Sequence, residues 1–394
     1  MILPNRTRPV ATWAGAITLA AILLLGCSDS GSSTNASADG ATCPKGTTIG
    51  FLGRFDGAEP AATSPTALGV QLAVDEFNAA NPECQIALEV ESGSGGATAA
   101  ATAAQKLVAS RQVLAVVGPQ FSGDVEEAGP VLNTGGVPFV SATATRTDLS
   151  AQGWDMFHRV VGTNKTIGIG AANYMVKTLG AAKIAVIDDG TPYSIDLAST
   201  VTTALGASAT AVGTITDAPG SVDDIVARLE GFGTEDAVYF AGYELKAAEL
   251  LRQLRAANIS STFVGSDTLP SATFLEAAGE NVEGVIATCL CAPLSEISKG
   301  EDFSSRFRAS FPAADPNEEY AAEAFDATNL ILATIAAGNH DRPSITNALS
   351  NITWEGITRS IQFNANGDVV DPVVWVSEVR GGSFRAIGSV NGNE

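Results

Sequence analysis

The chain has 394 residues, of which 45% are hydrophobic and 16% are charged, and its formal net charge is −21. The apolar content is enough to bury a sizeable core and excludes a wholly disordered chain. The acidic balance argues against a nucleic-acid partner, whose phosphates need a basic surface. The chain has only two histidines, which argues against a histidine-rich metal site. At about 150 residues per domain, the length corresponds to two or three domains.

The first 26 residues have the pattern of an export signal. Two arginines precede a mostly apolar run at 10–25, and the run ends in Leu-Leu-Gly-Cys at 24–27. This ending resembles the bacterial lipobox, in which a small residue precedes an acylated cysteine. A transmembrane anchor is the alternative, although a span needs about 20 apolar residues. We expect a signal peptide at 1–26 and a lipid on Cys27, which would anchor the protein to the cell membrane on its extracytoplasmic side.

A polar stretch separates this signal from the first predicted strand. Residues 28–42 are small, polar and without periodicity, so we expect a flexible tether at 27–44. No later apolar run is long enough to span a bilayer, which argues against a channel.

Four cysteines remain after Cys27, an even number that predicts disulfides in an oxidising compartment. Four cysteines allow three connectivities. Cys43 and Cys84 each precede one of the first two predicted strands, so we favour their pairing. Cys289 and Cys291 are then left for each other. In an extended segment that pairing would be strained, because the Cα atoms of residues i and i+2 lie near the upper limit for a bridge. No further ligands nearby suggest a metal.

From Thr47 onward, apolar strands alternate with helical periodicity in two series. Near-continuous Val, Ile and Ala strands between helices indicate parallel sheets covered on both faces, so the two series predict an α/β protein with two doubly wound lobes. The first series has strands at 48–53, 85–90, 113–118 and 137–141, and helices at 66–80, 97–110 and 125–133. The second has strands at 183–188, 210–215, 237–242 and 262–266, and helices at 167–179, 194–205, 222–230 and 246–257.

The tail after residue 291 has a different pattern. It predicts helices at 303–311, 319–337 and 343–349, and then a strand, an Asn-Gly turn and a strand within 360–379. This tail does not make a third lobe, so we expect it to complete the first two, with several crossovers at a hinge. The expected boundaries are 45–162 and 292–352 for lobe 1, and 163–291 and 353–394 for lobe 2.

Polar residues follow the strands at the edge where open parallel sheets bind ligands. In lobe 1, the segments 119–123 and 141–145 supply hydroxyls and free amides at helix N-termini, which suit an anion such as a carboxylate. In lobe 2, the segments 188–193, 242–243 and 266–268 supply tyrosines and carboxylates, which suit an ammonium. Together the two sets suit a zwitterion. A single hydroxyl of this kind would by itself be read as a helix cap.

At these residues the chain resembles a known family. It looks like a type I periplasmic solute-binding protein of the branched-chain amino acid (Leu/Ile/Val-binding) group, which serves ABC transporters, and the resemblance covers about 45–389. The motifs that carry it are IGFLG, GVQLAVDEFNAANP, AAQKLV, VLAVVGPQFSG, GVPFVSATATRTDL, AVYFAGYELKAAELLRQLRAANI, FVGSDTL and FNANGDVV.

The resemblance implies roles for residues in lobe 1. Ser122 and Thr145 match positions that bind the ligand carboxylate, and Thr143 matches a residue whose backbone contacts the ligand.

It also implies roles in lobe 2. Tyr193 and Tyr243 match tyrosines that line the pocket, and Asp267 falls where the family places an acid that receives the ammonium. The true branched-chain binders usually have a longer Glu at that position.

The expected function is therefore an extracytoplasmic substrate-binding lipoprotein of an ABC importer. It would bind a branched-chain or related amino acid between two closing lobes. We expect a monomer that interacts with the permease subunits of the transporter, needs no cofactor and is not an enzyme. The alternatives are a ligand-binding sensor subunit, or a binder of an amide, urea or an aromatic acid, since the group includes such proteins. A hydrolase is a remote alternative, because no serine lies in Gly-x-Ser-x-Gly.

Overall fold

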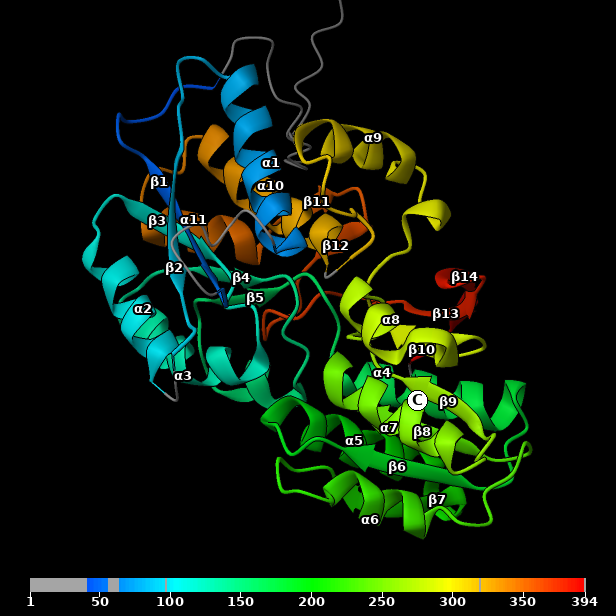
Figure 1. The fold of residues 1–394 in the computed structure, drawn as a ribbon. Coiled ribbons are helices and arrows are strands. Elements are labelled where there is room, and N and C mark those ends of the chain that lie inside the picture. Colours follow the sequence, from blue (N-terminus) through cyan, green and yellow to red (C-terminus); the bar gives the residue numbers. More distant parts are fainter. Residues whose placement is uncertain (1–40, 56–63, 96–97, 319, 393–394) are drawn as a thin grey trace, which may run out of the picture. The chain divides into compact units, whose positions relative to one another are not determined.

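The computed structural model describes residues 41–55, 64–95, 98–318 and 320–392. The expected signal peptide, the lipid site at Cys27 and most of the tether lie outside the described residues. The described chain forms two α/β lobes, each built around its own sheet, as the sequence pattern predicted (Figure 1).

The first sheet is entirely parallel and has the order β2-β1-β3-β4-β5. Its strands are buried runs of apolar residues, because helices cover both faces. The strand order reverses between β1 and β3, which creates a crevice at their carboxyl ends. The strands are β1 (Thr48–Gly53), β2 (Ala87–Ser92), β3 (Val113–Val117), β4 (Phe139–Ser141) and β5 (Phe157–Arg159).

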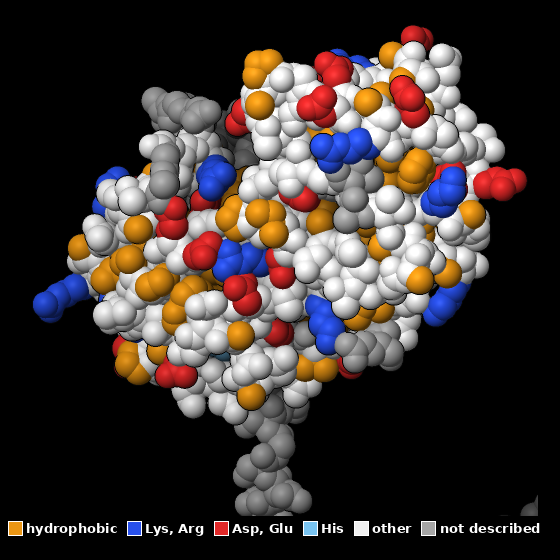
Figure 2. Space-filling view, turned by 90° about the horizontal axis from the view of Figure 1, so that it is seen from below, with side chains coloured by type: hydrophobic (Ala, Val, Ile, Leu, Met, Phe, Trp, Pro, Cys, Tyr) orange, Lys and Arg blue, Asp and Glu red, His pale blue; other side chains and the backbone are white. Residues whose placement is uncertain are grey.

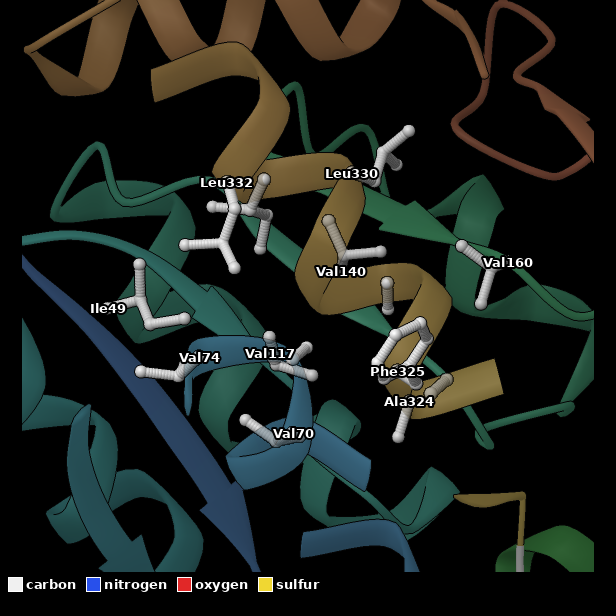
Figure 3. Close-up of a cluster of buried hydrophobic side chains, with 14 of the residues drawn as sticks. Ile49, Val70, Val74, Val117, Val140, Val160, Ala324, Phe325, Leu330 and Leu332 are labelled. Atoms are coloured by element: carbon white, nitrogen blue, oxygen red, sulfur yellow. The ribbon is translucent and has the colours of Figure 1, made fainter. Parts of the chain in front are cut away.

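Two groups of helices cover the faces of this sheet. Helices α1 (Pro65–Ala80), α10 (Ala321–Ala336) and α11 (Arg342–Ser350) pack on one face, with α9 (Gly300–Ser310) beside them. Figure 3 shows the centre of that core, where Val70 and Val74 of α1 and Phe325 of α10 lie over Val117 of β3. Helices α2 (Ala99–Ala109) and α3 (Ser122–Thr134) cover the opposite face.

The second sheet has the order β14-β13-β10-β9-β8-β6-β7. Five of its strands run parallel, and β13 and β14 are antiparallel additions at one edge. The order reverses between β6 and β8, so a second crevice forms at the carboxyl ends of these two strands. The strands are β6 (Ile184–Asp188), β7 (Ala209–Thr214), β8 (Ala237–Ala241), β9 (Thr262–Gly265), β10 (Ile286–Cys289), β13 (Val374–Arg380) and β14 (Ser383–Val390).

Helices cover both faces of the parallel part of this sheet. Helices α4 (Asn164–Asn173) and α5 (Pro192–Leu205) pack on one face. Helices α6 (Ser221–Arg228), α7 (Glu244–Ala256) and α8 (Ala272–Ala278) pack on the other.

The strand, Asn-Gly turn and strand expected within 360–379 are present, but the two strands lie in different sheets. The turn itself is present, because the amide of Gly367 donates to the carbonyl of Asn364 at 3.0 Å. Residues 362–364 and 368–370 pair locally around the turn, through the bridge between Phe363 and Val369 and two backbone hydrogen bonds, and beyond them the chain segments separate. Strand β12 (Ser360–Gln362) pairs with β11 (Thr353–Glu355), whereas β13 joins the second sheet. The two strands separate because their apolar side chains enter different cores.

The packing also bears on the lobe boundary. Ile361, Phe363 and Val369 are buried in the core of the first lobe, whereas Val374 and Val376 belong to that of the second. We propose that the chain returns to lobe 2 after Val369 rather than at residue 353.

Two disulfides tie parts of the chain together. Cys43 is bonded to Cys84, with 4.7 Å between the Cα atoms, and Cys289 is bonded to Cys291, with 5.1 Å between the Cα atoms. The first joins the segment before β1 to the segment after α1. The second lies at the carboxyl end of β10, beside the site described below.

The face of the molecule drawn in Figure 2 shows no basic patch, and the described helices include no membrane span. On the face in Figure 2, Lys and Arg side chains are separated from one another by acidic, apolar and polar groups. Among the described helices, none combines the length and the apolar character needed to cross a bilayer. The described residues also contain no group of three or more His, Cys, Asp and Glu side chains that could bind a metal ion.

Candidate functional site

A cavity of about 110 Å³ lies where the carboxyl ends of strands from both sheets meet. It is lined from the first lobe by the residues after β3 and β4, and from the second by residues after β6, β8 and β9. Both topological switch points contribute to it, which is the expected place for a ligand in doubly wound sheets. The described lining residues are Gln120, Phe121, Ser122, Thr143, Tyr193, Tyr243, Glu244, Asp267, Thr268, Pro270 and Tyr320.

The loop after β3 brings Ser122 to the cavity as the first residue of α3. A side chain at Gly118 would place its Cβ 2.4 Å from the Leu52 carbonyl oxygen, so the close approach of β3 to β1 requires glycine here. The Ser122 hydroxyl accepts a hydrogen bond from the amide of Arg146 at 3.2 Å, which leaves its own proton free to be donated. A hydroxyl and free amides at a helix N-terminus suit an anion.

Thr143 lines the same part of the cavity, and its hydroxyl is used within the protein. It donates to the backbone carbonyl of Gln120. The neighbouring Ser141 hydroxyl donates to the carbonyl of Pro119 at 2.9 Å. These two bonds join the loop after β4 to the loop after β3 and fix their relative position.

Thr145 follows β4 and is not among the described lining residues of the cavity. Its side chain is 1% exposed, and its Oγ1 has no hydrogen-bond partner among the residues that the structure describes. The buried guanidinium of Arg159 donates to the carbonyls on either side, Ala144 at 3.1 Å and Arg146 at 2.8 Å. These two bonds hold the backbone on both sides of Thr145.

Asp267 forms the polar centre of the wall from the second lobe. It follows β9 and is buried, and its two carboxylate oxygens accept hydrogen bonds from the phenols of Tyr193 and Tyr320. Burial raises the pKa of the Asp267 carboxyl, and the two phenol bonds oppose that shift. Burial raises the pKa of both phenols well above the ordinary value, so they remain donors. Each carboxylate oxygen can accept a further bond.

Tyr243 supplies an aromatic wall. The amide of Tyr243 donates to the buried Asp189 carboxylate at 2.8 Å, which fixes the start of α7. Its ring centroid lies 5.3 Å from that of Tyr193 and 5.8 Å from that of Phe121. The contact with Phe121 is made across the two lobes, so aromatic surfaces from both close around the cavity.

The charge of the lining is negative. Asp267 and Glu244 are its two carboxylates, and no Lys, Arg or His is among the described lining residues. The nearby Arg54 stacks over Phe121 and is paired with Asp124, with 2.9 Å between Nε and Oδ2. Such a lining suits a ligand with a positive group near Asp267.

The structure thus brings five of the six residues proposed from sequence to one cavity, and Thr145 is not among its described lining residues. Sequence reasoning missed Tyr320, which lies in the tail, has a positive φ of 60° and precedes α10. It gave no role to Gln120, although it noted the segment that contains it. A polar residue directly after a buried strand was the only available signal for Gln120.

Comparison with known proteins places this geometry in a family. Residues 46–383 match the model of a family described as periplasmic binding protein. The chain belongs to this family. This match confirms the resemblance seen in the sequence, and the solved structures described next confirm the type I fold.

Individual relatives agree with this assignment. The periplasmic binding protein is 28% identical over 311 residues to the Leu/Ile/Val-binding protein BraC3 of Rhizobium johnstonii, covering 77% of this chain and 83% of the relative. It is similar to the branched-chain amino acid transporter substrate-binding protein LivJ of Streptococcus pneumoniae, solved with isoleucine. The TM-score is 0.80 and the identity 25%, over 87% of this chain and 99% of LivJ.

A second solved structure shows the same fold. The leucine-binding protein LivK of Thermotoga maritima has a TM-score of 0.79 at 23% identity, over 88% of this chain and 99% of LivK.

Proposed function

We propose that this periplasmic binding protein is the extracytoplasmic substrate-binding component of an ABC importer and that it binds an α-amino acid between its two lobes. The observation that carries the proposal is the buried Asp267 carboxylate opposite the neutral anion-binding groups at the start of α3. The amino acid relatives support the ligand class.

The ligand would be held by its charged ends. Ser122 and the first amides of α3 would bind the carboxylate from the first lobe, together with the unpaired Thr145 hydroxyl. Asp267 would receive the ammonium from the second lobe, and Tyr193 and Tyr243 would cover the ligand. A buried ammonium needs a carboxylate partner, because an unpaired charge in a dry cavity is costly.

Binding of this kind performs no chemistry. Contacts that only the closed lobes can make would shift the population toward the closed form, which the permease would recognise. The protein would act as a monomer, without a cofactor and not as an enzyme. A lipid on Cys27 would keep it beside the membrane.

Isothermal titration calorimetry of the mature protein against the twenty amino acids tests the proposal. We expect saturable binding, with one ligand per chain, for a subset of them. If no amino acid binds while amides, urea or aromatic acids do, the fold serves another ligand and the amino acid assignment is wrong. Mass spectrometry of ligand released from the natively purified protein is an independent check.

A further inference from the structure

The side-chain oxygen of Gln120 is a buried polar atom that the proposed ligand contacts do not use. The Gln120 side chain lines the cavity and is 8% exposed. Its Oε1 has no hydrogen-bond partner in the described part of the chain, and its Nε2 makes only a long contact of 3.4 Å with the Thr66 hydroxyl. Buried polar atoms in native proteins are nearly always paired, so this one needs an explanation.

The backbone of Gln120 is held by the neighbouring loop. Its backbone carbonyl accepts the hydroxyl proton of Thr143. On the other side, Gly53 leaves the space that the carboxamide occupies, because a Cβ there would lie 3.1 Å from Oε1 and 2.8 Å from the Phe51 ring. The carboxamide therefore packs closely against strand β1.

The rest of the lining does not resemble an aliphatic pocket. No Leu, Ile, Val or Met is among the lining residues that the structure describes. The apolar surface is supplied by Phe121, Pro270 and the faces of the tyrosine rings, and hydroxyls of Thr143 and Thr268 lie between them. An aliphatic ligand side chain would leave the Gln120 oxygen unpaired, and such sites discriminate strongly against ligands that lack the matching polar group.

We propose that Gln120 is a specificity-determining residue that hydrogen-bonds a hydroxyl or carboxamide group on the ligand's side chain. The preferred ligands are then polar, uncharged α-amino acids (Ser, Thr, Asn and Gln) rather than branched aliphatic ones. Hydroxyl and carboxamide groups both donate and accept, so they can satisfy either end of the Gln120 amide. This inference rests on the proposed amino acid function and refines its ligand class.

Calorimetry with the mature wild-type protein tests the inference directly. We expect at least one of Ser, Thr, Asn and Gln to bind about tenfold or more tightly than each of Leu, Ile and Val. Gln120→Leu should remove this preference, weakening the polar ligand by about tenfold and strengthening an aliphatic one. Gln105→Leu, at an exposed position on α2, is the matched control and should leave both affinities unchanged.

Each outcome decides something different. Binding of Leu, Ile or Val as tightly as the polar set would overturn the inference and leave the proposed function intact. Equal weakening of both sets by Gln120→Leu would also overturn it, since the residue would then be structural. The absence of binding by any amino acid would remove the proposed function and the inference with it. The wild-type series decides the matter even if the Gln120 variant does not fold.

Discussion

Arg159 and Asp368 are 209 residues apart in the sequence and form an ion pair, with 2.5 Å between Nε and Oδ1. The Arg159 side chain is 0% exposed and stands at the end of β5, whereas Asp368 lies in the turn that follows β12. The same guanidinium also binds the carbonyls on either side of Thr145. This ion pair therefore connects the turn after β12 to the loop after β4.

Asp368→Asn should destabilise the protein strongly, since it leaves a buried guanidinium without its counter-charge. We expect a loss of about 3–5 kcal/mol in the free energy of unfolding, measured by urea denaturation. Glu378→Gln, which breaks an exposed pair with Arg380, is the control and should cost less than about 1 kcal/mol. Similar small losses for both variants would show that the Arg159 pair does not organise the loop.

Asp267→Asn should weaken ligand binding without lowering the melting temperature of the protein. The variant keeps an acceptor for one phenol but loses the charge that would pair with an ammonium, so we expect amino acid binding to weaken by about tenfold or more. Burial raises the pKa of this carboxyl, so its removal should leave the melting temperature unchanged or higher. Calorimetry and thermal denaturation measure the two effects. Asp224→Asn, at an exposed position on α6, is the control. An unchanged dissociation constant for Asp267→Asn would show that Asp267 does not bind the ligand's ammonium group.

Thr145→Val tests whether the buried, unpaired hydroxyl of Thr145 binds the ligand. If that hydroxyl serves the ligand, its replacement should weaken binding. The same change should stabilise the ligand-free protein by about 1 kcal/mol, because a buried unpaired polar group is removed. Titration calorimetry and urea denaturation of the same preparation would measure both. A variant that is destabilised with unchanged affinity would give Thr145 a structural role instead.

Glu323 should make the stability depend on pH. It is buried at the start of α10, accepts a bond from the amide of Ala292 at 2.8 Å, and burial raises its pKa from 4.5 to about 7. Between these values the folded protein holds a proton that the unfolded chain releases, so this contribution to stability is lost as the pH rises through that window.

Glu323→Gln stays neutral throughout, which isolates this contribution. Between pH 4.5 and 8, the free energy of unfolding of the wild type should fall relative to that of Glu323→Gln by about 3 kcal/mol. Denaturation curves recorded at several pH values measure the difference. Glu301→Gln, exposed in α9, is the matched control. Parallel pH profiles for wild type and Glu323→Gln would contradict the prediction.

The two series of buried strands were predictable, because strands such as VLAVV at 113–117 are apolar on both faces and can only lie inside a covered sheet. The candidate residues followed from the same logic, since Ser122 and Asp267 lie in the segments that follow such strands. Their ligand roles remain predictions.

Long-range packing could not be predicted in the same way. The Asn-Gly turn at 366–367 was a correct local signal, but it does not indicate which sheet each flanking strand joins, because that depends on which core receives Ile361 and which receives Val376. Tyr320 follows no strand, and nothing in its sequence neighbourhood indicates a bond to Asp267, 53 residues earlier.

Tyr320 also joins two parts of the interior. Its ring packs in the core of the second lobe, whereas the next residue, Ala321, packs in that of the first, and the backbone turns sharply between them. Its phenol bonds the carboxylate proposed to receive the ligand's charge. The carboxylate proposed to bind the ligand is therefore hydrogen-bonded to the residue at which the chain passes from one core to the other. A substitution at Asp267 that changed the preferred ligand would therefore also change a hydrogen bond at the crossing between the two lobes.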